Sequence, residues 1–250
     1  MKSVHARTKM MAALAMLALT TPVFAANMDN RIEQSARQTH VFKTYLQGED
    51  IKIQAKDGAV TLTGIVSDDY HKSLARETVA GLPGVTTVDN RLEIKGAAPT
   101  ANSDAWLREK VKVTLLFHRS VSTRTEVDVK DGVVTLRGAA DSQAQKELTA
   151  DYARDVEGVK GVTNTMVVTP APKKTQTIGE KIDDASITAQ VKMTLLYHRS
   201  TSAINTKVET KGGEVTLYGK ARTAAEMSLA TKLANDVNGV TNVNNRMVIE

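Results

Sequence analysis

The 250-residue sequence contains no cysteine, and this absence removes several functions at once. There can be no disulfide, no thiolate nucleophile and no thiolate metal site. There is also no cysteine that could carry a lipid anchor. Aromatic residues make up only 4% of the chain, with a single tryptophan, Trp106. The glycine-rich G-x-x-x-x-G-K-[ST] loop is missing too, which excludes that route to nucleotide binding.

A strong charge of either sign is also lacking. The formal net charge is +5, but three of the 33 basic residues and none of the 28 acidic ones lie within residues 1–25, which leaves +2 for the rest. Such a balance is not the electrostatic footprint of a nucleic-acid-binding protein. We therefore expect no nucleic acid among its partners.

The longest apolar run is confined to the N-terminus. Lys2, Arg7 and Lys9 make a basic start, and MMAALAMLAL at 10–19 follows, then Val-Phe-Ala at 23–25. This pattern is typical of a secretory signal peptide, which we expect to span residues 1–25 and to be cleaved after Ala25. The run is too short to cross a bilayer, which takes about 20 residues. The sequence thus predicts a protein exported to a bacterial periplasm.

Three copies of one pattern fill the remainder of the chain. The first landmark is KDGAVTLTG at 56–64, KDGVVTLRG at 130–138 and KGGEVTLYG at 211–219. The second landmark follows the turn glycine by 26 residues in every copy, as GVTTVDNRLEI from 84, GVKGVTNTMVV from 158 and GVTNVNNRMVI from 239. Equal spacing without insertions indicates one compact unit made three times.

Each copy predicts the same order of elements. Alternating apolar residues and threonines indicate strands, and Asp-Gly or Gly-Gly between two such runs indicates a tight hairpin. The piece between the landmarks begins with a capping residue and carries apolar residues at helical spacing. We therefore expect an α+β fold of three tandem α/β sandwich units. Each unit is helix-strand-strand-helix-strand, with helices on one face of a three-stranded mixed sheet.

The repeats also predict the domain boundaries. Unit 1 spans 28–95, unit 2 spans 103–169 and unit 3 spans 183–250, with an extended linker at 170–182. A core of about 65–70 residues is only marginally stable by itself. We therefore expect the units to pack against one another.

The VTLxG landmark followed by GVxxVxN resembles the BON domain family, and the resemblance covers all three units. Gly64, Gly138 and Gly219 match the family's characteristic glycine and are interpreted as a structural motif. The resemblance implies a non-enzymatic periplasmic protein, similar to osmotically inducible members of the family. Such a protein would protect the envelope under osmotic stress by attaching to phospholipid surfaces or to envelope proteins. A chaperone-like, client-binding role is the alternative.

One heptapeptide, TLLFHRS at 114–120, recurs as TLLYHRS at 194–200. In a structural interpretation it closes the first helix of units 2 and 3. The histidine then lies at the buried end of the apolar stripe, and the arginine lies in the last turn, where a cation interacts favourably with the helix dipole. Unit 1 has VFKTYLQ in this place, at 41–47.

In a functional interpretation the same region contacts an anionic, phospholipid surface. The candidate residues are Lys112, Arg119, Lys192 and Arg199. Arginine suits phosphate because its planar fork donates two hydrogen bonds. Each cation near an anionic surface contributes about 1 kcal/mol, so several together predict weak, salt-sensitive binding.

Catalytic and metal sites are not expected. There is no G-x-S-x-G elbow, and Ser120 and Ser200 follow a histidine too closely to form a preassembled pair with it. The four histidines after the signal peptide show no zinc-site spacing; they are His40, His71, His118 and His198. We therefore expect no enzyme activity, no metal and no cofactor.

Overall fold

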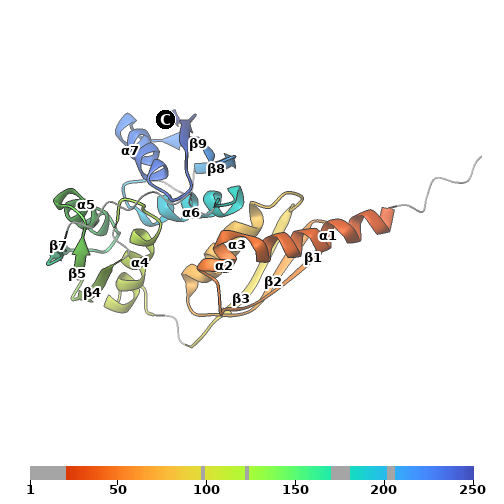
Figure 1. Ribbon diagram of the computed structural model, residues 1–250, viewed down its shortest axis with the longest axis horizontal. Helices are drawn as coiled ribbons and strands as arrows, with labels where there is room; N and C mark the ends of the chain where they lie inside the picture. The colour runs from red at the N-terminus through yellow and green to blue at the C-terminus, as the bar shows by residue number, and fades with distance from the viewer. Residues whose placement is uncertain (1–20, 97–98, 122–123, 170–180, 202–205) are drawn as a thin grey trace, which may run out of the picture.

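The computed structural model describes residues 21–96, 99–121, 124–169, 181–201 and 206–250. The chain forms three α/β units, which lie around helices near the centre of the molecule (Figure 1). The predicted signal peptide lies outside the described residues up to position 20, and most of the predicted linker lies outside them as well. None of the described helices has the length and apolar character needed to cross a membrane.

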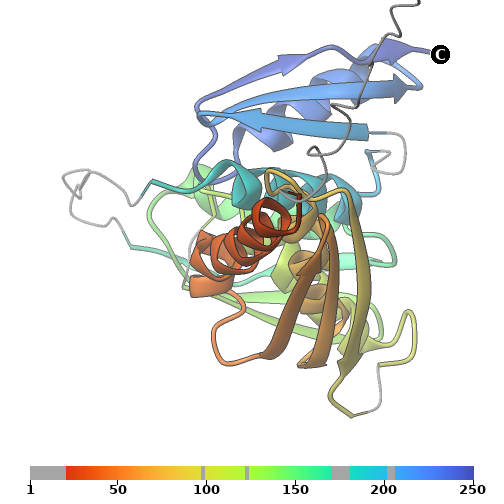
Figure 2. The same cartoon turned by 90° about the vertical axis from the view of Figure 1, so that its right-hand side faces the viewer.

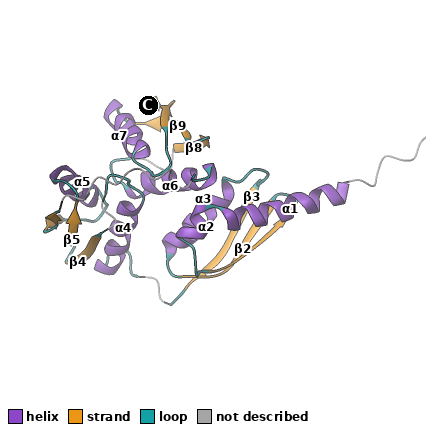
Figure 3. Cartoon of the chain, viewed as in Figure 1, coloured by secondary structure: helices purple, strands orange, loops and turns teal. Residues whose placement is uncertain are grey.

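Unit 1 is built on a three-stranded sheet of order β1-β2-β3, in which β2 pairs antiparallel with β1 and parallel with β3. A long helix and a short one precede the sheet, and one helix makes the crossover (Figure 3). The elements are α1 Thr21–Gln38, α2 His40–Thr44, β1 Asp50–Lys56, β2 Ala59–Val66, α3 Asp69–Ala80 and β3 Thr87–Ile94.

Units 2 and 3 repeat this plan with a single first helix and a last strand that is broken in two. Unit 2 contains α4 Asp104–Leu116, β4 Thr125–Lys130, β5 Val133–Ala140, α5 Gln143–Arg154, β6 Gly161–Asn164 and β7 Val167–Val168. Unit 3 contains α6 Asp184–Tyr197, β8 Thr206–Lys211, β9 Glu214–Ala221, α7 Ala224–Asn235, β10 Asn242–Asn245 and β11 Val248–Ile249. The last strands pair parallel with β5 and β9, so the predicted fold class and mixed sheet are confirmed.

Each hairpin turn is fixed by an aspartate of the unit's first helix, which is the first residue of α4 and α6 and lies within α1 in unit 1. In unit 2 the turn residues Asp131 and Gly132 have positive φ angles of 53° and 79°, as a two-residue type I′ turn requires. Their N–H groups donate to the two carboxylate oxygens of Asp104, at 2.7 and 2.8 Å. Asp29 and Asp184 do the same in the other units. One side chain thereby ties helix to hairpin in every unit.

The asparagine of the GVxxVxN landmark ties the crossover helix to the last strand. In unit 2 the Asn164 side chain donates to Lys146 O at 2.6 Å and accepts from Met166 N at 3.2 Å. Asn90 and Asn245 make the equivalent pair of bonds in units 1 and 3. The repeated asparagine is therefore structural, because one end of its amide bonds the backbone of the crossover helix and the other end bonds the backbone of the last strand.

The landmark glycines occupy positions that no other residue fits. Gly64, Gly138 and Gly219 have φ angles of 121°, 108° and 130°. A Cβ atom added at Gly138 would lie 2.0 Å from Arg124 O, and one at Gly64 would lie 1.9 Å from Asp50 O, across the antiparallel pair of strands. Both the backbone angle and the close approach of the neighbouring strand thus demand glycine.

Unit 1 completes its core with helices of the other two units. Its buried cluster includes Val113 and Phe117 from unit 2 and Ala185, Ala189 and Met193 from α6. Units 2 and 3 have clusters of their own, in which α4 and α6 contribute their other faces. The expectation that the units pack against one another is confirmed, and Figure 2 shows α6 running between unit 1 and the sheet of unit 3.

Replacing Gly138 by alanine tests the motif. We expect Gly138→Ala to lower the free energy of unfolding by about 3 kcal/mol or more, because the strained φ and the clash with Arg124 O add together. Gly161→Ala is the matched control in the same unit, since its Cβ would meet nothing within 4 Å, and we expect a change within about 0.5 kcal/mol. Urea unfolding followed by Trp106 fluorescence measures both. Equal effects would contradict the explanation.

Candidate functional site

The two HRS turns, residues 118–120 and 198–200, lie at the contact between units 2 and 3. Helix α4 ends at Leu116 and α6 at Tyr197, so each turn follows the end of its own helix. Each turn then pairs with the end of the crossover helix of the other unit. His118 forms an isolated antiparallel bridge with Val237, and His198 forms one with Val156. The contact therefore consists of one motif used twice in exchanged positions, and we name it the clasp.

Each histidine of the clasp binds an aspartate of the opposite unit. His118 Nδ1 lies 3.1 Å from Asp236 Oδ2, and His198 Nδ1 lies 2.8 Å from Asp155 Oδ2. The two rings meet edge to face, with their Nε2 atoms 3.2 Å apart. Their side chains are 0% and 1% exposed. The result is a buried Asp-His-His-Asp chain that crosses the boundary between the units.

The serine and arginine of each turn contact the same aspartates. Ser120 Oγ donates to Asp236 Oδ1, and Ser200 Oγ donates to Asp155 Oδ1. The backbone N–H of Arg119 donates to Asp236 O at 2.9 Å, and that of Arg199 donates to Asp155 O at 3.0 Å. Every residue of the HRS turn therefore binds the last residues of the opposite crossover helix.

The side chain of Arg119 reaches further along the opposite unit. Its guanidinium donates to Asn235 O and to Val240 O, and its Nε lies 3.8 Å from Asp236 Oδ1. These carbonyls lie at and beyond the C-terminus of α7, where a cation is favourable. The expectation that this arginine lies in the last turn of its own helix is wrong. It lies past the end of α4 and contacts the helix of the other unit, because the chain turns there to meet unit 3.

Tyr152 of α5 breaks the symmetry of the clasp. Its ring stacks on His118 with centroids 3.9 Å apart, and its hydroxyl donates to Asp236 Oδ2 at 2.9 Å. Unit 3 has Leu233 at the corresponding position, four residues before the Val-x-Gly-Val sequence that ends the helix. Asp236 therefore accepts from one more donor than Asp155, and the two histidines have different surroundings.

Burial and partners shift the titration of these groups. Burial acts to raise the pKa of Asp236, but hydrogen bonds from His118, Ser120 and Tyr152 outweigh it and lower the pKa. The pKa of Asp155 is lowered in the same way, because bonds from His198 and Ser200 outweigh its burial. The pKa of His118 is lowered, mainly by burial and also by the charge of His198. Burial beside Asp236 raises the pKa of Tyr152. Both carboxylates are therefore ionised at neutral pH.

This geometry does not make a hydrolytic site. Ser120 and Ser200 donate to aspartates instead of lying against an imidazole, so neither has the general base that nucleophilic serine requires. The two Nε2 atoms face each other and are closed off from solvent. What the arrangement does chemically is hold two units together and bind protons.

The four predicted anion-contact residues are placed differently from one another. Arg119 and Arg199 belong to the clasp but remain 44% and 48% exposed. Lys112 is half-exposed, with Nζ 3.2 Å from Glu109. Lys192 lies between units, with Nζ 2.8 Å from Glu77 Oε2 of α3. The structure does not test their binding to anions, which stays a prediction.

Asp155 and Asp236 are the site residues that sequence reasoning missed. A signal for them exists in the repeats. An Asp-Val pair precedes the second landmark at 155–156 and at 236–237, whereas unit 1 has Gly81-Leu82 there. Unit 1 also lacks the HRS turn. Both halves of the clasp are thus present together in units 2 and 3 and absent together from unit 1.

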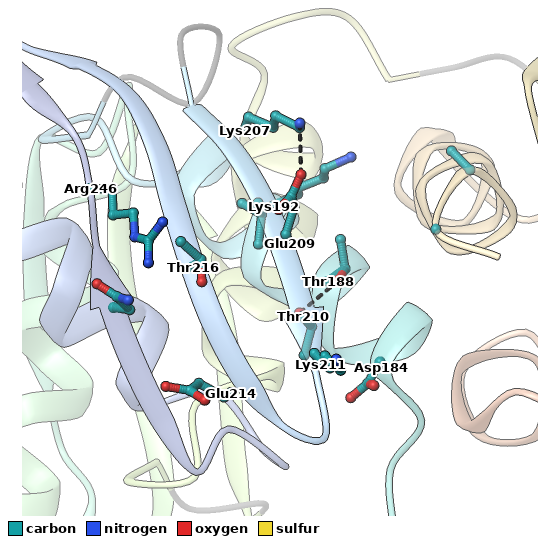
Figure 4. Close-up of a pocket in the computed structure, with 14 residues that line it drawn as sticks. Asp184, Thr188, Lys192, Lys207, Glu209, Thr210, Lys211, Glu214, Thr216 and Arg246 are labelled. Carbon is teal, nitrogen blue, oxygen red and sulfur yellow. Dashed lines mark hydrogen bonds and ion pairs between the residues drawn. The ribbon is translucent and has the colours of Figure 1, made fainter. Parts of the chain in front are cut away.

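Outside the clasp, metal clusters and large cavities are the features of the described residues that bear on a candidate site. Within the described ranges, no group of three or more His, Cys, Asp or Glu side chains is placed to hold a metal ion. A cavity of about 780 Å³ opens between the end of α3, helix α6 and the sheet of unit 3 (Figure 4). Its lining mixes charges of both signs, with Lys207 paired to Glu209 at 2.7 Å. It therefore offers no concentrated charge for a ligand.

Removing one carboxylate tests the clasp. We expect Asp155→Asn to lower the free energy of unfolding by about 2–4 kcal/mol, because it leaves His198 buried beside a neutral group. Asp151→Asn on the same helix removes only an exposed pair with Arg154, and we expect a change below about 0.5 kcal/mol. Thermal unfolding of both variants at neutral pH measures the difference. Equal loss in the two variants would contradict the inter-unit role.

The acid dependence of the wild-type protein follows from the same contacts. A carboxylate whose pKa is lower in the folded state stabilises that state above its unfolded pKa of about 3.9. This contribution is lost as pH falls through the lower, folded value. We therefore expect the free energy of unfolding of Asp155→Asn to fall less than that of the wild type below about pH 4. Urea unfolding across this range measures it, and parallel profiles would contradict it.

Comparison with known proteins agrees with the repeat structure. The BON domain model matches residues 28–96, 103–170 and 183–250. The osmotically-inducible protein Y of Escherichia coli strain K12 is 34% identical over 143 residues, covering 55% of this chain and 71% of that protein. A 21 kDa hemolysin of Actinobacillus pleuropneumoniae is 28% identical over 164 residues, covering 63% and 73%.

Among solved structures, the C-terminal domain of CdsD, a structural protein of the Chlamydia trachomatis type III secretion system, is similar over 90% of this chain and 98% of that one. Its identity is 15% and its TM-score 0.24, so no shared arrangement is inferred from it. The family match, in contrast, covers all three units with their landmark glycines and asparagines in place. The chain therefore belongs to the BON domain family.

Proposed function

We propose that this protein is a non-enzymatic periplasmic protein that protects the bacterial envelope under osmotic stress by attaching peripherally to anionic phospholipid surfaces. Membership of the BON family and similarity to an osmotically inducible protein support the biological setting. One structural observation carries the lipid contact. In both unit 2 and unit 3, the last turn of the first helix carries an exposed leucine that has a lysine four residues before it and an arginine three residues after it.

The Leu116 patch consists of Leu116, Lys112 and Arg119. Leu116 is 45% exposed. The three residues line a cavity of about 630 Å³. Its lining also includes the apolar side chains of Leu115, Val121 and Val127 and one carboxylate, Glu126. An apolar wall with cations at hand suits an amphiphile with an anionic head group.

The Leu196 patch of unit 3 repeats this pattern with Leu196, Lys192 and Arg199. Leu196 is 51% exposed. Lys192 and Lys112 both pair with a glutamate, but Lys192 is only 31% exposed, with Glu77 of unit 1 at 2.8 Å. Lys112 is 50% exposed, with Glu109 at 3.2 Å. We therefore expect the Leu116 patch to contribute more to binding than the Leu196 patch.

The free energy of membrane binding depends on only a few charged side chains and one leucine in each patch. Each cation near an anionic membrane contributes about 1 kcal/mol, and burying one leucine side chain contributes about 1.5–3 kcal/mol. Binding should therefore be weak, peripheral and sensitive to salt. Its sensitivity to salt should also distinguish it from the insertion of a helix into the bilayer.

A chaperone-like role is the second candidate, and a different observation favours it. The last strands of units 2 and 3 expose apolar side chains at their ends; these are Val167, Val168, Val248 and Ile249. Exposed apolar strands at a sheet edge can add an extended segment of another protein. This role would be supported if the wild-type protein suppresses aggregation of an unfolded client. The Val167→Thr plus Val248→Thr variant should suppress it less, with its vesicle binding unchanged.

Vesicle co-sedimentation tests the lipid proposal. We expect the full chain to bind vesicles that contain phosphatidylglycerol at low salt, and to bind poorly at high salt or to phosphatidylcholine alone. Lys112→Glu changes the patch by two charges, and we expect it to weaken binding by about tenfold or more. Leu116→Ser should weaken it by about tenfold without altering the clasp.

Lys52→Glu is the matched control, because Lys52 is exposed on β1 of unit 1, away from both patches. It makes the same change in net charge as Lys112→Glu. We expect its binding to stay close to that of the wild type. Absence of binding to either vesicle, or equal losses in the control and in Lys112→Glu, would overturn the proposal. Arginine variants are avoided because Arg119 also holds the clasp.

A further inference from the structure

The contacts of the buried histidine pair in the clasp call for an odd number of ring protons. Three contacts run through the two rings: His118 Nδ1 to Asp236, His118 Nε2 to His198 Nε2, and His198 Nδ1 to Asp155, at 3.1, 3.2 and 2.8 Å. Each is within hydrogen-bond distance, and each needs one proton between its two heavy atoms. Two neutral imidazoles supply two protons, and two imidazolium ions supply four. Only three protons satisfy all three contacts.

The positions of these protons follow from the partners. Ionised carboxylates accept hydrogen bonds and do not donate, so both Nδ1 atoms are donors. One proton remains for the Nε2 atoms, so one ring is neutral and the other is a cation. Burial lowers the pKa of His118, which makes it the neutral ring that accepts at Nε2.

We propose that this pair is a proton-binding site that locks unit 2 to unit 3 with one shared proton, and that uptake of a second proton opens the clasp. A fourth ring proton would set two N–H groups against each other at 3.2 Å. It would also place two cations inside a site closed to water. Such an arrangement loses its central hydrogen bond and gains the repulsion of like charges at low dielectric.

Groups from both units face the histidine pair and determine how it responds to pH. The facing charged and titratable groups are Asp155, Asp236, Arg119, Arg199 and Tyr152. The two carboxylates hydrogen-bond the two rings and are also paired with the two arginines. With the two arginines included, the site has a net formal charge of +1, and a second proton would raise it to +2. Tyr152 donates to Asp236 and stays neutral.

The direction of the pH effect follows from His118. Its pKa is lowered, mainly by burial, with His198 adding to the shift and Asp236 opposing it. An opened clasp exposes His118 to water, where its pKa returns to about 6.5. Below about pH 6.5 both opened rings become charged, so the open state binds more protons than the closed one and the closed state loses stability as pH falls. Above about pH 6.5 the open state binds fewer protons than the closed one, so the closed state is most stable near neutral pH. The clasp is therefore closed at neutral pH and opens in mild acid.

Histidine NMR of the full chain tests the proton count directly. At about pH 7.5, we expect one ring protonated at both nitrogens and the other only at Nδ1. The midpoint of the second protonation should lie below that of free histidine. Two neutral rings at this pH, or simultaneous titration of both near about 6.5, would overturn the proposal. This measurement needs no variant and holds whether or not any substitution folds.

Distance measurement tests the opening. Because the chain has no cysteine, spin labels at Lys130→Cys on β4 and Ser228→Cys on α7 report only the separation of units 2 and 3. We expect one narrow distance at about pH 7.5 and a broader, longer distribution at about pH 5. Circular dichroism should show that secondary structure persists. An unchanged distribution at about pH 5 would overturn the proposal.

Two further labelled variants assign the effect. His118→Gln keeps a polar side chain that cannot titrate, and we expect no difference between its distance distributions at the two pH values. His71→Gln is the control, because His71 Nδ1 also lies 3.2 Å from carboxylates but in unit 1. It should keep the wild-type transition. A wild-type transition retained in His118→Gln, or lost in His71→Gln, would contradict the assignment to the clasp.

Discussion

The first half of helix α6 is buried on every side, and the placement of the three units depends on that burial. Residues 185–191 are all buried, which covers about two turns and therefore every face of the helix. One face contributes Ala185, Ala189 and Met193 to the core of unit 1, and another contributes Ile187, Val191 and Leu195 to unit 3. At its N-terminus, Asp183 and Ser186 accept from the first N–H groups of α2. A unit of this size gains stability by sharing a helix in this way.

The clasp adds specificity to this apolar packing. Apolar contacts between α4, α6 and unit 1 tolerate small displacements, whereas the chain from Asp236 through His118 and His198 to Asp155 has one acceptable geometry. Burying these groups is costly unless every partner is in place. The clasp therefore selects one arrangement of units 2 and 3 and makes it dependent on protonation. Unit 1, which has neither half of the motif, is held by apolar surface and by helix caps.

The same turns lie next to the proposed lipid contact. Arg119 belongs both to the clasp and to the Leu116 patch. A structural and a functional interpretation of the heptapeptide are therefore compatible, because its histidine, serine and backbone hold the units together while Lys112 and Leu116 remain exposed. The repeated element that looks like a catalytic motif in the sequence is an inter-unit joint, with a surface patch beside it.

The repeats in the sequence determined the architecture of each unit. Turn chemistry, capping residues and strand periodicity act over a few residues, so they predicted the hairpins, the crossover helix, the mixed sheet and the obligatory glycines such as Gly138. They also predicted that His118 and His198 are buried. The tertiary structure alone decided what those histidines meet. Asp236 lies 118 residues from His118 and Asp155 lies 43 from His198. The pairing depends on how units fold back on one another, and local periodicity contains no information about contacts between units.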